Sequence, residues 1–120
     1  MKFRLEDNTL RLRLSEAELT EFAATGRVVG STNFGSDPAQ QLYYALERTA
    51  ATSAAAPIAE GVTANGLALN YAAGNITVRV PAELADEWTG TARIGFSGEI
   101  LVAENQRLRI LVEKDLDCRH

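Results

Sequence analysis

Four basic side chains near the start of the chain carry its most pointed charge pattern. Lys2 and Arg4 alternate along one short segment, and Arg11 and Arg13 alternate along the next. If residues 7–8 form a two-residue turn, Arg4 faces Arg11 and Lys2 faces Arg13 across a hairpin. Like charges in direct opposition are destabilising, so this surface favours an anionic neighbour. A phosphate or carboxylate of a ligand, a protein partner or a nucleic-acid backbone would fit it.

An internal source of negative charge is the competing interpretation. Glu47 and Glu113 alternate outward on later strand-like segments, and Glu16 and Glu18 follow the basic hairpin directly. Ion pairs with these carboxylates would neutralise the hairpin and leave it without a role in binding.

The last residues group four side chains that can ligate a metal, namely Asp115, Asp117, Cys118 and His120. Carboxylate, thiolate and imidazole together suit zinc, but structural zinc sites usually show two spaced pairs of ligands. Ligands on a terminal segment also lack supporting hydrogen bonds from a second layer of residues. We therefore expect no metal and no other cofactor, with Cys118 packed against the core.

The residues offer no catalytic constellation. His120 is the single histidine and stands last, where an imidazole is poorly held for general-base catalysis. Acidic pairs such as Asp86 and Glu87 have the spacing of a solvated helix face. We expect a protein that binds rather than an enzyme.

Composition predicts one globular domain. The 120 residues are 46% apolar and 23% charged, and no apolar run approaches the ~18 residues of a membrane span. A net charge of −4 argues against nucleic acid as a partner. The single cysteine and the charged residues 2–7, where a signal peptide needs an apolar stretch, favour a cytoplasmic location.

Apolar alternation and cap chemistry predict the elements that position the basic hairpin. Residues 2–6 and 9–14 alternate as two strands. Ser15 and Glu18 have the spacing of a capping box, which opens a helix that ends near Gly26. A third strand is predicted at residues 27–34 and a fourth at residues 40–48.

The same order of elements recurs after a shift of 66 positions, which lays residues 2–49 on 68–115 without a gap. The phase of the apolar alternation carries the match, because a one-residue slip would turn every strand inside out. A hairpin turn is expected at Gly74-Asn75, the first helical residue at Pro81, and further strands at 93–102 and 107–114. Phe22 and Trp88 take equivalent, buried positions. Two similar units without common origin are the alternative.

The predicted fold is a single domain, 1–120, that is mainly β (α+β). Two β-β-α-β-β repeats, 2–49 and 68–115, are joined by an exposed linker at 50–67 and form a pseudo-twofold barrel or sandwich with two helices at its ends. In the second repeat Ala68, Asn70 and Thr77 stand where the first has three of its cations. The fold therefore does not require those charges.

The segment after Asn75 reads Ile76-Thr-Val-Arg-Val-Pro81 and continues to Trp88. It resembles the AbrB-type regulators and the MazE-type antitoxins, in which a strand of this kind enters the helix at a proline. The resemblance implies a β-β-α-β-β unit. In that family two chains interleave hairpins to close one barrel, and two copies in one chain would close it alone. A DNA-binding or antitoxin-type regulator is the function that it implies.

A second resemblance involves both ends of the chain. They read Met1-Lys2-x-Arg4-x-x-x-Asn8-x-x-Arg11-Leu12-Arg13-Leu14 and Leu111-x-Glu113-Lys114-Asp115-x-x-Cys118. Both look like a family of short uncharacterised bacterial proteins, which implies a bacterial cytosolic protein. Together these observations predict a small binding or adaptor module for a protein partner or an anionic ligand.

Overall fold

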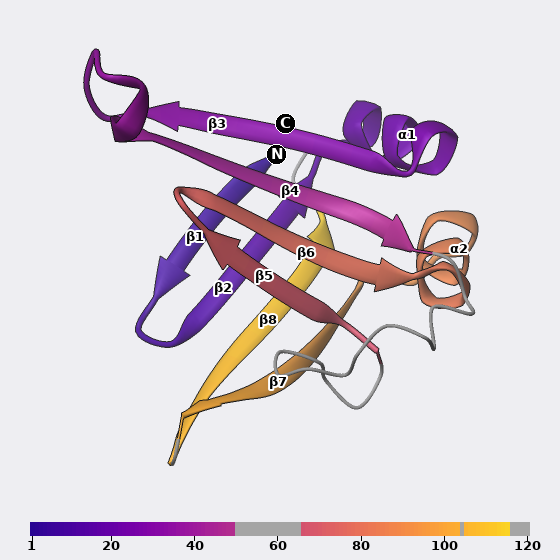
Figure 1. The fold of residues 1–120 in the computed structure, drawn as a ribbon. Helices are drawn as coiled ribbons and strands as arrows, with labels where there is room; N and C mark the ends of the chain where they lie inside the picture. The colour runs from indigo at the N-terminus through magenta and orange to yellow at the C-terminus, as the bar shows by residue number, and fades with distance from the viewer. Residues whose placement is uncertain (50–65, 104, 116–120) are drawn as a thin grey trace.

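The computed structural model describes residues 1–49, 66–103 and 105–115. They form eight strands, two α-helices and one short 3₁₀ helix (Figure 1). In chain order these are β1 (Lys2–Glu6), β2 (Thr9–Leu14), α1 (Glu16–Thr25), β3 (Arg27–Asn33), η1 (Pro38–Gln40), β4 (Gln41–Thr49), β5 (Ala68–Ala72), β6 (Asn75–Pro81), α2 (Ala82–Gly90), β7 (Gly95–Ala103) and β8 (Gln106–Lys114). None of the described helices is long and apolar enough to cross a membrane.

The strands form two four-stranded sheets. Sheet A has the order β1-β2-β8-β7 and sheet B the order β3-β4-β6-β5. Each sheet joins two antiparallel hairpins through a central parallel pair, β2 with β8 in sheet A and β4 with β6 in sheet B. The expectation of a mainly β fold with two helices is confirmed. The barrel is wrong, because among the described residues no pairing joins the outer strands of one sheet to those of the other.

The core lies between the two sheets. Burial alternates along β2, where Leu10, Leu12 and Leu14 are buried and the residues between them are partly exposed. Phe3 of sheet A stacks on Tyr44 of sheet B, with ring centroids 4.7 Å apart. The buried cluster draws on both sheets and both helices, and its largest fully buried members are Trp88, Phe22, Leu12, Leu14, Leu46, Leu67, Ile100 and Ile110.

Local chemistry sets the ends of α1 as predicted. The Ser15 hydroxyl accepts a hydrogen bond from the Glu18 amide at 3.2 Å, and the Glu18 carboxylate accepts one from the Ser15 amide at 2.9 Å. Gly26 ends the helix with a φ of 82°, a conformation that glycine adopts without strain. In α2 the expected first helical residue is wrong by one position. Pro81 still pairs with Thr49 in sheet B, so it precedes the helix.

Both helices lie at the same end of the molecule (Figure 1). Phe22 and Trp88 are both fully buried there, as predicted, and Trp88 also meets Phe96 edge to face at 5.2 Å. The expectation of two helices at the ends of the fold is wrong, because both lie at one end. The apolar stripes of the two helices cover each other and one shared end of the core.

The ungapped shift of 66 positions does not align the buried residues of β3 with those of β7. It equates Val28 with Ile94, yet Ile94 precedes β7 and is 54% exposed. Val28 faces Leu46 in β4, and Phe96 faces Val112 in β8. The segment between α2 and β7 is longer than that between α1 and β3, so the buried positions are two residues out of step.

The expected linker, 50–67, lies almost wholly outside the described residues. At its end the chain is described again, and Leu67 is fully buried in the core.

Candidate functional site

The basic hairpin has the predicted register. Arg4 pairs with Arg11 and Lys2 pairs with Arg13 across β1 and β2. The turn between the strands includes Asp7 with a φ of 51°. Because alternate residues of a strand point to opposite faces, the four cations share the outer face of sheet A.

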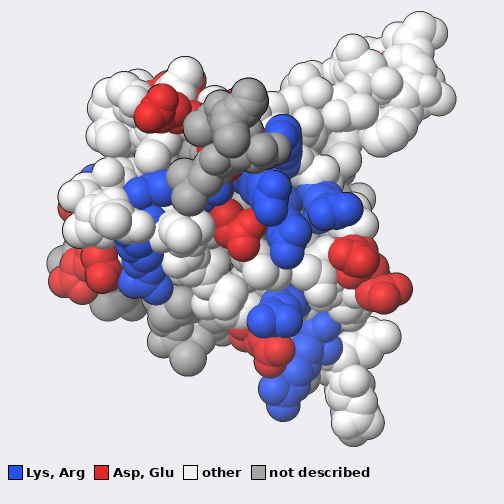
Figure 2. Space-filling view, turned by 180° about the vertical axis from the view of Figure 1, so that it is seen from behind, with Lys and Arg blue, Asp and Glu red and all other residues white. Residues whose placement is uncertain are grey.

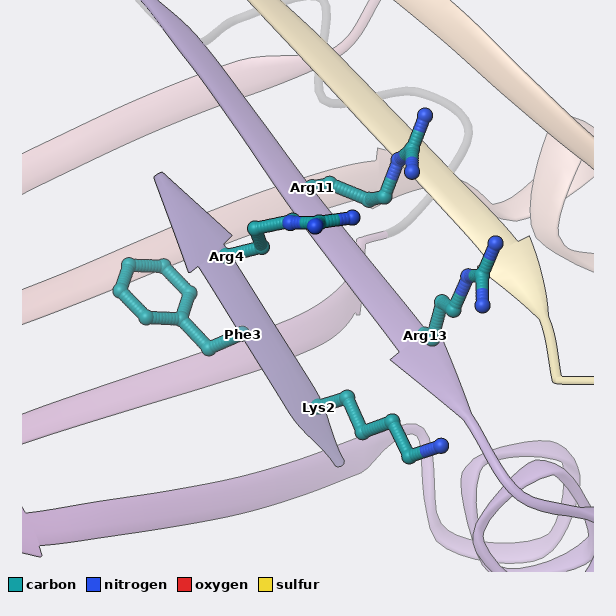
Figure 3. Close-up of a pocket in the computed structure, with 5 residues that line it drawn as sticks. All are labelled: Lys2, Phe3, Arg4, Arg11 and Arg13. Atoms are coloured by element: carbon teal, nitrogen blue, oxygen red, sulfur yellow. The ribbon is translucent and has the colours of Figure 1, made fainter. Parts of the chain in front are cut away.

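A surface hollow of about 270 Å³ lies on this hairpin, lined by Lys2, Phe3, Arg4, Arg11 and Arg13. In Figure 3 the Arg4 side chain reaches from β1 toward β2, while the Phe3 ring points away from the four cations. Arg11 and Arg13 both extend toward β8. The hollow is therefore cationic.

Two carboxylates neutralise part of this charge. Arg13 Nε lies 3.3 Å from Glu113 Oε1, and Arg11 Nε lies 3.8 Å from the same oxygen. Lys2 Nζ lies 2.9 Å from Asp115 Oδ2. The prediction that Glu113 forms ion pairs with the basic hairpin is confirmed.

The prediction for Glu47 is wrong. Glu47 lies in sheet B, where its two carboxylate oxygens pair with Arg27 at 3.3 Å and Arg79 at 3.2 Å. Glu18 pairs instead with the amino group of Met1. Within the described part of the chain, Glu113 and Asp115 are thus the carboxylates that pair with the basic hairpin, and they reach Lys2, Arg11 and Arg13.

Arg4 differs from the other three cations. It is exposed, and it makes no ion pair with any residue of the described ranges 1–49, 66–103 and 105–115. Across sheet A it shares a row with Arg11, Leu111 and Ser97, because Arg4 pairs with Arg11, Arg11 with Leu111 and Leu111 with Ser97. This row, which we call the arginine row, holds two cations and no carboxylate.

The neighbouring rows of the same face each contain at least one carboxylate. One row continues from Lys2 through Arg13 to Glu113, and the other from Glu6 through Thr9 to Arg109 and Glu99. Figure 2 shows the resulting patches of basic side chains with acidic ones set among them. Of these three rows, the arginine row is thus the one that contains cations and no carboxylate.

Sheet B offers a reference for this face. A shift of 66 positions takes Arg4 to Asn70 and Arg11 to Thr77, which pair with each other, and Thr77 pairs onward with Ala45. The corresponding row of sheet B is thus uncharged. Arg79, which lies 66 positions after Arg13, keeps its ion pair with a glutamate.

The shifted pKa values of the described residues lie away from the basic hairpin. Burial acts to raise the pKa of Glu18, but hydrogen bonds from the Met1 amino group and from Ser15 outweigh it and lower that pKa. The Asp86 pKa is lowered by hydrogen bonds from Arg48, whose Nη2 lies 3.0 Å from Asp86 Oδ2. The first pair lies at the start of α1, and the second joins the middle of α2 to the end of β4.

The candidate metal ligands are not brought together in the described part. Asp115 pairs with Lys2, whereas Asp117, Cys118 and His120 lie outside the described residues. Within those residues no three side chains of histidine, cysteine, aspartate or glutamate form a group that could hold a metal.

Sequence reasoning missed a second hollow, between the two sheets. It has a volume of about 460 Å³ and is lined by Leu5, Leu10, Leu42, Leu69, Tyr71, Ile76 and Leu108. Each of these residues occupies an inward position of its strand, so the alternation predicted only a filled core. The one local signal was that all seven lie close to a turn or a strand end.

Comparison with known proteins assigns the chain to a family. The model of a family of unknown function, DUF7009, matches residues 1–120, so the chain belongs to that family. No curated protein and no solved structure matches the chain.

Proposed function

We propose that this member of the DUF7009 family is a cytoplasmic, non-enzymatic binding module. Its site is the outer face of sheet A, which receives an anionic group of a ligand or a protein partner. The observation that carries the proposal is the arginine row, in which Arg4 and Arg11 stand in direct cross-strand opposition and no residue of the row is a carboxylate.

The energetics of this row support binding. Two like charges directly opposite each other destabilise a strand pair. Arg11 obtains only a distant contact at 3.8 Å from Glu113, and the hollow beside Arg4 is open to solvent. A bound phosphate or carboxylate would accept hydrogen bonds from both guanidinium groups and relieve their repulsion.

We also propose that the chain arose as a tandem repeat with approximate twofold symmetry. The parallel strand pairs support this. Leu10 faces Ile110 in sheet A, and Ile76 faces Tyr44 in sheet B. Leu10 and Ile76 lie 66 positions apart, as do Tyr44 and Ile110, so the shift exchanges the two pairs. The hairpin registers agree in the same way, since Lys2 faces Arg13 and Ala68 faces Arg79. On this proposal sheet B keeps the uncharged row of the common repeat, and sheet A acquired the arginine row for binding.

Retention on a phosphate-bearing matrix tests the proposal. The whole chain carries a net charge of −4, so retention at low salt would report a local cationic site. We expect retention by the unchanged protein and its loss in the double variant Arg4→Ala, Arg11→Ala. The matched control is Arg27→Ala, Arg79→Ala, which removes two cations from the outer face of sheet B and should stay bound.

Equal loss in both double variants would show non-specific charge attraction and contradict the proposal, as would failure of the unchanged protein to bind. A mixed-sequence DNA duplex separates the remaining alternative, a DNA-binding regulator. Binding to the duplex with a steep dependence on salt would favour that function. We expect no binding to the duplex, because the acidic remainder of the surface repels a polyanion.

A further inference from the structure

The apolar groove between the sheets has the form of a ligand site. Its floor includes Leu10, which is buried, and Ile76 and Leu108, which are partly buried. Its two lips are Leu5 and Tyr71, which are 59% and 66% exposed although both point to the inner side of their sheets. Apolar surface at inward positions is thus left in contact with solvent.

The groove lies where the two sheets part, at the end away from the helices. The turn at residues 7–8 joins the strands of Leu5 and Leu10, and the turn at 73–74 joins those of Tyr71 and Ile76. At the other end of the strands Phe22 and Trp88 close the space between the sheets. The turns at 7–8 and 73–74 supply no comparable apolar side chains, so these described residues leave this end uncovered.

The lining specifies the chemistry of an occupant. Its seven side chains are six aliphatic groups and one tyrosine, none of them charged, and the Tyr71 hydroxyl is the single polar group among them. A volume of about 460 Å³ falls in the usual range for small-molecule sites, ~300–1,000 Å³. We infer that this groove binds a small uncharged apolar molecule, of the size of two fused aromatic rings or a medium-length alkyl chain.

A second copy of the chain fits the groove less well. A stable dimer buries ~800 Å² on each partner. Beyond Leu5 and Tyr71, the neighbouring turns present the exposed polar residues Asp7, Asn8 and Asn105, whose burial in a dimer would cost their hydration. A small molecule needs only the hollow itself.

The site is separate from the one proposed above. The groove uses inward residues of both sheets, whereas the arginine row lies on the outer face of sheet A. Loss of binding at one site therefore leaves the other unaffected.

Fluorescence titration with N-phenyl-1-naphthylamine, an uncharged probe that brightens in apolar surroundings, tests the inference. We expect saturable binding of one probe per chain. Leu5→Glu and Tyr71→Glu each place a charge at a lip, where binding would strip it of water, and should weaken binding at least roughly tenfold. Val29→Glu is the matched control, because Val29 is 51% exposed but lies on the outer face of sheet B.

All three variants change exposed side chains, so each should keep the far-UV circular dichroism and the melting temperature of the unchanged protein to within a few degrees. Absence of probe binding, or equal weakening by Val29→Glu, would overturn the inference. Sedimentation that shows a dimer of the unchanged protein, dissolved by Leu5→Glu, would also overturn it, since a second copy would then fill the groove.

Discussion

Phe22 of α1 and Trp88 of α2 meet edge to face, with ring centroids 5.9 Å apart and ring planes at 63°. Trp88 Nε1 also donates a hydrogen bond to the Ile94 carbonyl at 2.9 Å. The indole therefore joins the two helices and holds the segment that leads into β7. This pair of rings closes the end of the core that lies beneath both helices.

Trp88→Ala should reduce the free energy of unfolding by about 3–5 kcal/mol, because it removes a fully buried aromatic side chain and leaves a cavity. Urea denaturation followed by far-UV circular dichroism measures this loss. Phe34→Ala is the control, since Phe34 is 70% exposed, and it should change stability by no more than ~0.5 kcal/mol. Similar losses in the two variants would contradict the central position of Trp88.

Gly30→Ala should destabilise the protein by about 1–3 kcal/mol. A Cβ at Gly30 would lie 2.5 Å from Tyr44 Cε2, and the Tyr44 ring is held by its stack on Phe3. Thermal unfolding measures the effect. Gly90→Ala should be harmless, because a Cβ there meets nothing within 4 Å.

A double-mutant cycle locates the cause of that loss. In a Tyr44→Ala background the ring is gone, so Gly30→Ala should cost much less than it does in the unchanged protein. An unchanged cost would place the strain elsewhere in β3.

Acid should weaken the protein through Glu18. Its pKa is lower in the folded than in the unfolded chain, so its contribution to stability is complete above the unfolded pKa and is lost as the pH falls through the folded value. Glu18→Gln should therefore flatten the decline in stability below about pH 4.5. Urea midpoints at pH 3 to 7 measure this, with Glu21→Gln, an exposed carboxylate of the same helix, as the control that should keep the decline.

Glu113→Gln should strengthen retention on the phosphate matrix. The substitution removes the carboxylate that occupies Arg13 at 3.3 Å and Arg11 at 3.8 Å, and so adds a net positive charge to the basic hairpin. Glu47→Gln makes the same change in total charge but on sheet B, where it frees Arg27 and Arg79. If both variants gained equally, the position of the arginine row would have no special role.

The features that the amino-acid sequence determined by itself are local ones. The register of the basic hairpin follows from a short turn between two alternating strands, and the ends of α1 follow from Ser15, Glu18 and Gly26. Burial of Phe22 and Trp88 follows from their place on the apolar stripes of two helices. Each depends on residues close together in the chain, which is why the pattern alone was sufficient.

Tertiary structure alone decided which distant strands pair. An alternating strand offers the same backbone hydrogen bonds to any partner, so the pattern did not distinguish a closed barrel from two sheets joined through parallel pairs. That pairing placed Glu113 beside Arg13 but moved Glu47 to the opposite sheet. Tertiary packing also left Leu5 and Tyr71 exposed between the two sheets. Alternation along a strand predicts the direction of a side chain, whereas only the packing of the two sheets decides whether another residue covers it.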